Sequence, residues 1–174
     1  MLNNNYGLKY ITKENAIEID PTNELWYAYT KENNFEHMDF KVWLDLFNEP
    51  KLSEEVPIDV RILFEVARGT IIYGYYYYPL YMVGMEQLFR IMECAVSLKC
   101  KECKEFKKGK GTFNQKIKFL SSKGLLDEEY WELVRNLRNF CSHPNVQNLL
   151  PPANVYDELE QCAERINHLF ANIK

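Results

Sequence analysis

Apolar residues recur along most of the chain at the three- and four-residue spacing of amphipathic helices. Phe40, Trp43, Leu44 and Phe47 stand in the i, i+3, i+4, i+7 pattern, which places their side chains on one side of a helix. Similar stripes continue to the end of the sequence. We therefore expect an all-α bundle with helices over about 23–31, 38–47, 58–104, 113–123, 127–143 and 154–173.

Several residues are placed to begin or end these helices. Pro79 either kinks the long stretch from 58 to 104 or divides it into two helices, because proline lacks the backbone N–H that a helix interior needs. Thr112 and Gln115 have the spacing of a capping box at a helix start. Gly124 is placed to end that helix, and Asp127 is placed to cap the next one.

Charge divides the chain into two parts. Residues 1–60 contain 5 Lys and Arg against 12 Asp and Glu, whereas residues 61–174 contain 16 against 13. We expect an acidic helical N-terminal appendage at residues 1–57 and the main helical domain at residues 58–174. The mildly basic balance of the second part leaves nucleic acid open as a partner.

The sequence predicts a cytoplasmic protein with no membrane partner. The longest uncharged run, residues 69–85, includes six tyrosines and one proline, so it is too short and too polar to span a bilayer. We expect these tyrosines to pack against other parts of the protein or at a dimer surface; the alternative is that some of them stack on bases. The first twenty residues do not resemble a signal peptide, and five cysteines do not suggest a disulfide framework.

A lone C-x-x-C pair raises the question of a metal. Cys100 and Cys103 form it, and Cys141 with His143 is the nearest pair that would complete a set of four ligands. Because the sequence contains a single pair of this kind, we expect no metal site and no other cofactor.

One expected helix, the last but one, groups polar residues on one side. With Asn139 at zero and about 100° per residue, Arg135 and His143 lie near −40° and +40°, and Ser142 lies near −60°. Arg138 lies at the edge, near −100°, where its long side chain reaches toward Asn139. The apolar residues fall between about 100° and 220°, so we expect the polar group to face away from the core.

These residue types suit chemistry at a phosphodiester. A guanidinium offers planar, permanently charged donors to a phosphate, and a histidine can move a proton to or from a ribose 2′-OH. The alternative is an ordinary polar surface, which every amphipathic helix has.

The segment from Arg138 to His143 resembles the Arg-x4-6-His signature of HEPN domains, with a polar residue, Asn139, directly after the arginine. The context is similar as well. A long helix precedes the motif, followed by the segment Gln115–Leu126, which contains the Lys-Ile-x-x-Leu pattern common in these domains. The likeness covers about residues 60–170.

This resemblance implies an all-α, HEPN-like bundle and metal-independent cleavage of RNA, as in ribonucleases of defence, toxin and RNA-processing systems. His143 would be the acid/base group, Arg138 would stabilise the phosphate and its transition state, and Asn139 would orient them. The 2′-OH would attack the adjacent phosphate, leaving a 2′,3′-cyclic phosphate and a 5′-OH. Two protomers usually share one composite site, so we expect a homodimer.

The resemblance also bears on other partners and functions. An antitoxin or another defence protein is a further expected partner. Some HEPN toxins carry a tyrosine two residues after the histidine as a target for nucleotide modification, but this sequence has Asn145 there, so silencing by that route is not expected. The alternatives are a non-catalytic RNA- or protein-binding module and a purely structural helical dimer.

Other residues are candidates for supporting roles. Arg135 and Ser142 share the polar side of the motif helix, and Glu86 and Arg90 would line the site from a neighbouring helix. A glutamate there would tune the motif residues; the alternative is an ion pair of structural value only. The segment Lys99–Lys110 has a local net charge of +4, which suits either a phosphate-binding loop or a solvated one.

Overall fold

The computed structural model describes residues 9–24, 26–29, 35–37, 39–103, 105–106, 111–141 and 150–171. The helices in these ranges are α1 (Phe40–Phe47), α2 (Ile58–Tyr73), α3 (Leu80–Glu102), α4 (Phe113–Ser122), α5 (Glu128–Cys141) and α6 (Pro152–Phe170). Two three-residue strands, β1 (Tyr27–Tyr29) and β2 (Phe35–His37), precede them. The predicted all-α bundle is confirmed.

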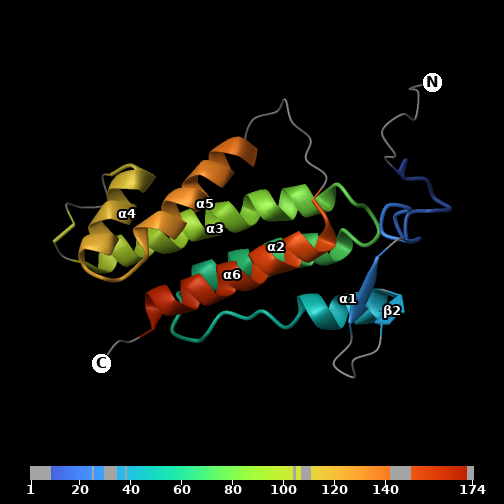
Figure 1. The fold of residues 1–174 in the computed structure, drawn as a ribbon, viewed down its shortest axis with the longest axis horizontal. Coiled ribbons are helices and arrows are strands. Elements are labelled where there is room, and N and C mark those ends of the chain that lie inside the picture. Colours follow the sequence, from blue (N-terminus) through green and yellow to red (C-terminus); the bar gives the residue numbers. More distant parts are fainter. Residues whose placement is uncertain are drawn as a thin grey trace.

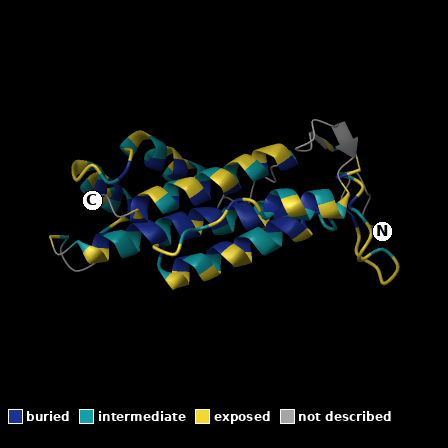
Figure 2. Cartoon of the chain, turned by 90° about the horizontal axis from the view of Figure 1, so that it is seen from below, coloured by how far each residue is buried: buried dark blue, intermediate teal, exposed yellow. Residues whose placement is uncertain are grey.

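Helix α3 is at the centre of the bundle. It contacts α2, α4, α5 and α6, and Figure 1 shows α5 along one side of it and α6 along the other. The buried positions of the helices face one another, and the exposed positions lie on the outside (Figure 2). The buried core residues of α3 are Tyr81, Met85, Leu88, Phe89, Ile91, Met92, Ala95, Val96 and Cys100.

Pro79 separates α2 from α3 rather than kinking a single helix. Beyond this boundary the two helices pack very closely. A Cβ at Gly84 of α3 would lie 2.3 Å from Ile71 Cγ1 of α2, so no larger residue fits there without displacing its neighbour.

The predicted helix ends around α4 are confirmed. Thr112 Oγ1 accepts from the backbone N of Gln115 at 3.3 Å, and Gln115 Oε1 accepts from the backbone N of Thr112 at 2.9 Å, which completes the capping box. Gly124 ends the helix with a φ of 70°, a conformation that favours glycine. Asp127 Oδ1 accepts from the backbone N of Glu129 at 3.1 Å, at the start of α5.

Aromatic packing fills the connection between α2 and α3. Tyr75, Tyr78 and Tyr81 are buried, and the ring centroids of Tyr81 and Trp43 lie 5.5 Å apart. Tyr78 also donates its hydroxyl to the carbonyl of Leu150 at 2.6 Å. For these three tyrosines the predicted packing within the protein is confirmed. None of the helices described here is long and apolar enough to cross a membrane.

Three buried polar residues hold the segment before α1 against the connection between α2 and α3. Lys9 Nζ donates to the carbonyl of Tyr76 at 3.0 Å, and Asp20 Oδ2 accepts from the backbone N of Tyr78 at 2.9 Å. Asn23 Nδ2 donates to two carbonyls of the same connection at 2.8 and 3.0 Å. Hydrogen bonds to the backbone thus compensate the burial of all three side chains.

The predicted helix over residues 23–31 is wrong, so the appendage is only partly helical. Residues Tyr27–Tyr29 form β1, which pairs antiparallel with β2, because alternating aromatic residues favour the extended backbone. The other predicted helix of this region is confirmed as α1. Its Trp43 and Phe47 are fully buried in the same core as α2 to α6, so α1 packs as part of the bundle.

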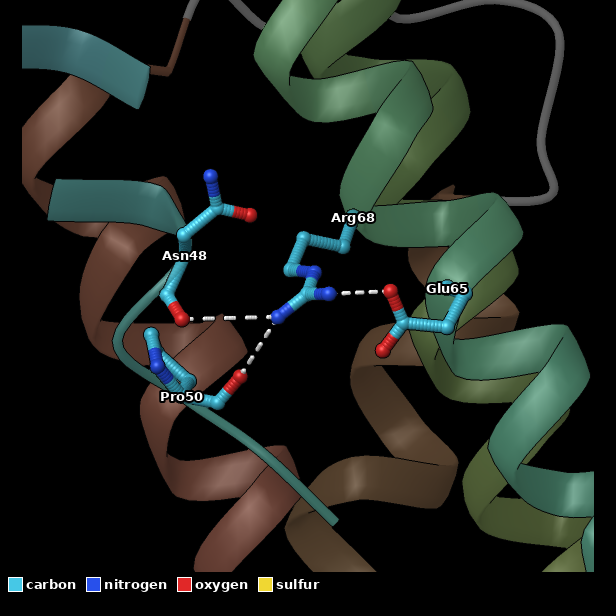
Figure 3. Close-up of polar contacts among 4 residues, drawn as sticks. All are labelled: Asn48, Pro50, Glu65 and Arg68. Carbon is cyan, nitrogen blue, oxygen red and sulfur yellow. Dashed lines mark hydrogen bonds and ion pairs between the residues drawn. The ribbon is translucent and has the colours of Figure 1, made fainter. Parts of the chain in front are cut away.

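Arg68 of α2 fixes the chain that leaves α1. Its Nη1 donates to the carbonyl of Pro50 at 3.2 Å and lies 3.5 Å from the carbonyl of Asn48, while Nη2 pairs with Glu65 on its own helix (Figure 3). The guanidinium therefore joins α2 to the connection between α1 and α2.

Candidate functional site

Helix α5 is rotated relative to the side that its apolar spacing predicts, although Val134 of the predicted side is buried and Leu137 packs against the core. Trp131 and Val134 are 2% and 1% exposed, whereas Leu133 is 52% exposed. Trp131 lies near −80° on the helical wheel, beside Arg138, so this side faces the bundle while Asn139 is exposed. The prediction that the whole polar group faces away from the core is therefore wrong for Arg138. The large indole of Trp131 buries more surface than Leu133 would.

Arg138 reaches across to helix α3. Its Nη2 lies 3.0 Å from Glu93 Oε2, and its Nη1 lies 3.4 Å from Oδ1 of the neighbouring Asn139. The side chains of Arg138 and Glu93 are 39% and 30% exposed. The guanidinium is thus held by two acceptors at the border between the bundle and solvent.

The carboxylate beside Arg138 belongs to Glu93, whereas Glu86 was the predicted candidate on this helix. The two glutamates are seven residues apart, about two turns of α3 on the same side. The ion pair of Arg138 with α3 is made by Glu93, while Glu86 is partly exposed and Arg90 exposed on the same helix. The sequence marked Glu86 and Arg90 as candidates, but it does not say which turn of α3 meets α5.

Helix α4 attaches to α3 one turn beyond Glu93. Lys116 Nζ donates to Ser97 Oγ at 2.8 Å, and Ser97 Oγ donates to the backbone carbonyl of Glu93 at 2.8 Å. A chain of polar contacts therefore links α5 to α3 and α3 to α4. The sequence suggested no role for Ser97, and Lys116 entered it only as the lysine of the Lys-Ile-x-x-Leu pattern.

The other predicted site residues fall into two groups. Arg135, one turn before Arg138, has a buried Nε without a hydrogen-bond partner among the described residues. Ser142 and His143 lie outside the described residues. Of the predicted catalytic residues, the structure therefore brings together Arg138 and Asn139, and it adds Glu93 to them.

An aromatic contact fixes α5 against α6. The guanidinium of Arg165 lies over the ring of Tyr130, 4.2 Å from its centroid, a favourable cation–π arrangement. Burial raises the pKa of Tyr130, so its phenol stays protonated at neutral pH. This contact helps to set the position of α5, and hence of Arg138, in the bundle.

The cysteines of the C-x-x-C pair do not form a metal site with other described residues. In the described ranges, no group of three His, Cys, Asp or Glu side chains is placed to hold a metal ion. Cys100 is buried, its Sγ donates to the carbonyl of Lys116 at 3.8 Å, and burial raises its pKa to about 11. The other two candidate metal ligands, Cys141 and His143, fall outside the described side chains.

No known family model, curated protein or solved structure matches this chain. The residues around Arg138 themselves therefore carry the functional conclusion. They supply a permanent positive charge, which suits binding a phosphate group, beside an amide and a carboxylate that both accept from it.

Proposed function

We propose that this protein is a metal-independent endoribonuclease of the HEPN type. The observation that supports the proposal best is the Arg138 guanidinium, held between Glu93 of α3 and Asn139 of α5. This arrangement lies in an all-helical bundle, the fold class that the resemblance to HEPN domains implies.

A guanidinium held in one orientation is what transition-state stabilisation requires. Charge that develops on a phosphate is stabilised best by donors that are already in position before the reaction. Glu93 and Asn139 limit the movement of the Arg138 side chain from two directions. A lysine there would offer a point charge without this planar arrangement of donors.

The proposed reaction needs one proton acceptor, one proton donor and a stabilising positive charge. The 2′-OH loses its proton and attacks the adjacent phosphorus, forming the O2′–P bond while the P–O5′ bond breaks. The leaving 5′ oxygen takes up a proton, so the products are a 2′,3′-cyclic phosphate and a 5′-OH. His143 is the proposed acid/base group, Arg138 stabilises the phosphate charge, and Asn139 orients them.

The proposed site is shared between two copies of the chain. One arginine and one histidine are too few to surround a phosphate, and a second motif helix would supply the rest. Leu133 on the outer side of α5 is 52% exposed, and a second protomer would cover it. Arg135, Ser142, Glu86 and Arg90 remain supporting candidates around this groove.

The setting follows from the same proposal. We place the enzyme in the cytoplasm, in a defence, toxin–antitoxin or RNA-processing system, where an antitoxin or another defence protein would control it. RNA is the proposed substrate.

Cleavage in the presence of EDTA tests the function directly. Purified protein should cut single-stranded or looped RNA, and DNA of the same sequence should survive because it lacks the 2′-OH. His143→Ala should lose about 10²–10⁴-fold in rate, the usual contribution of general acid–base catalysis. Arg138→Ala should lose a comparable factor, and Arg138→Lys should recover only part of it.

A matched pair of variants on α5 controls for effects on folding. Asn139→Ala should slow cleavage, whereas Asn136→Ala, the same exposed residue type one turn earlier, should not. Cutting by His143→Ala at the parental rate would show that the activity comes from a contaminant or another site. RNA binding without any cutting by the parent would favour the non-catalytic binding module.

A further inference from the structure

Helix α3 carries a polar stripe along one side, which we call the α3 polar stripe: Glu86, Arg90, Glu93, Ser97 and Lys101. At about 100° per residue, these five positions fall within roughly 80° of one another on the helix. Arg90 and Lys101 are exposed, and Glu86, Glu93 and Ser97 are partly exposed. The stripe therefore borders solvent along about 22 Å of helix.

Two neighbouring helices each bring a positively charged side chain to this stripe. Arg138 of α5 pairs with Glu93 at 3.0 Å, and Lys116 of α4 bonds to Ser97 at 2.8 Å. Glu93 and Ser97 are one turn apart, so the two contacts are separated by about 6 Å along α3. The guanidinium and the ammonium thus follow one another along the same side of the bundle.

Together with the two side chains from α4 and α5, the charges along this side of the bundle are mostly positive. Arg90, Lys101, Lys116 and Arg138 carry positive charge, and Glu86 and Glu93 carry negative charge, in a chain whose net charge is −4. Glu93 is already paired with Arg138. A row of positive side chains on an otherwise acidic protein is the electrostatic pattern expected of a nucleic-acid backbone contact.

We propose that the α3 polar stripe binds the backbone of single-stranded RNA, with Lys116 and Lys101 contacting phosphates next to the one at Arg138. The proposal rests on the proposed function, because it takes Arg138 as the cleavage centre. Lysine ammonium groups suit this role, since they bind phosphates as point charges without demanding one orientation. A single row of cations along one helix matches one strand better than two, so we commit to a single strand.

The salt dependence of binding tests the proposal separately from cleavage. The probe is a single-stranded RNA with 2′-O-methyl groups, which cannot be cut because the nucleophile is blocked. The logarithm of its binding constant is measured against the logarithm of salt concentration, where each phosphate contact in a single strand contributes about 0.7 to the slope. Lys116→Gln and Lys101→Gln should each reduce the slope by about 0.7.

Two further variants test whether a reduced slope comes from the charge at this position of α4. Lys118→Gln removes the same residue type from α4, about 200° away around the helix from Lys116, at an exposed position, and should keep the parental slope. Lys116→Arg keeps the charge and should restore the slope lost in Lys116→Gln, which excludes misfolding as the cause.

The outcomes separate the two proposals. Parental slopes in both Lys116→Gln and Lys101→Gln would overturn the binding role of the stripe, even if the parent cuts RNA. Equal losses with double-stranded RNA would overturn the single-strand assignment. Reduced slopes in a protein that never cuts RNA would support the stripe and contradict the enzyme.

Discussion

At the scale of single residues, the ion pair between Glu93 and Arg138 should contribute little to the stability of the fold and more to the rate of cleavage. Both side chains are about one-third exposed, so the ion pair contributes only about 0–1 kcal/mol to the free energy of folding. The same contact fixes the direction of the guanidinium, and small errors of position at a reacting centre reduce rates strongly. Stability and cleavage should therefore respond unequally to the loss of Glu93.

We expect Glu93→Gln to slow cleavage about tenfold while lowering the free energy of unfolding by less than about 1 kcal/mol. Single-turnover cleavage and thermal unfolding measure the two effects. Binding of uncleavable RNA should be unchanged or tighter, because a negative charge is removed beside the phosphate site. Glu93→Asp should recover part of the rate, since it keeps the carboxylate.

Glu102→Gln is the matched control on the same helix. It breaks the ion pair of Glu102 with Lys99, 3.2 Å long and away from Arg138, and should leave the cleavage rate unchanged. Equal losses in both variants would show that Glu93 acts only through general effects on α3.

At the scale of elements, the packing of α2 on α3 depends on one glycine. Gly84→Ala would place a methyl group against the side chain of Ile71, and overpacking of this kind typically costs about 1–3 kcal/mol. Gly69→Ala on α2 meets nothing within 4 Å and should stabilise the helix by up to about 1 kcal/mol, because alanine is the better helix former. Chemical denaturation of the two variants should give shifts of opposite sign.

A denaturation midpoint for Gly84→Ala at or above that of the parent would show that α2 and α3 can move apart without cost. The same comparison checks whether the contact at Gly84 fixes the position of α2 against α3, because Gly69 and Gly84 lie on these two helices.

Elements were predictable from the sequence where their causes are local. The capping box at Thr112, the glycine stop at Gly124 and the cap at Asp127 depend on neighbouring residues alone. The rotation of α5 was not predictable, because it depends on how Trp131 fits against the other helices. For the same reason the sequence, which marked Glu86 and Arg90 as candidates on this helix, did not show that the turn of α3 in contact with α5 carries Glu93.

At the scale of the whole molecule, the proposed site requires two copies of the chain. We expect light scattering at tens of micromolar to give twice the mass of 20.7 kDa, and cleavage per protomer to fall on dilution as the dimer dissociates. Leu133→Lys should weaken the dimer, because it places a charge where an exposed apolar side chain would otherwise be covered. A monomeric parent that cuts RNA at full rate would contradict the shared site.

The hydrogen bonds of Asp20 and Asn23 also have a consequence in time. They join Asp20 and Asn23 to residues 58 and 51 positions later in the chain. During synthesis, Asp20 has only local partners such as the backbone N of Thr22, and the distant hydrogen bonds cannot form until the connection between α2 and α3 has left the ribosome. Until then both polar side chains stay hydrated, and closing so long a loop slows their docking. Residues 20–23 are thus made before the residues on which they dock, and they are among the last of this segment to reach their final place.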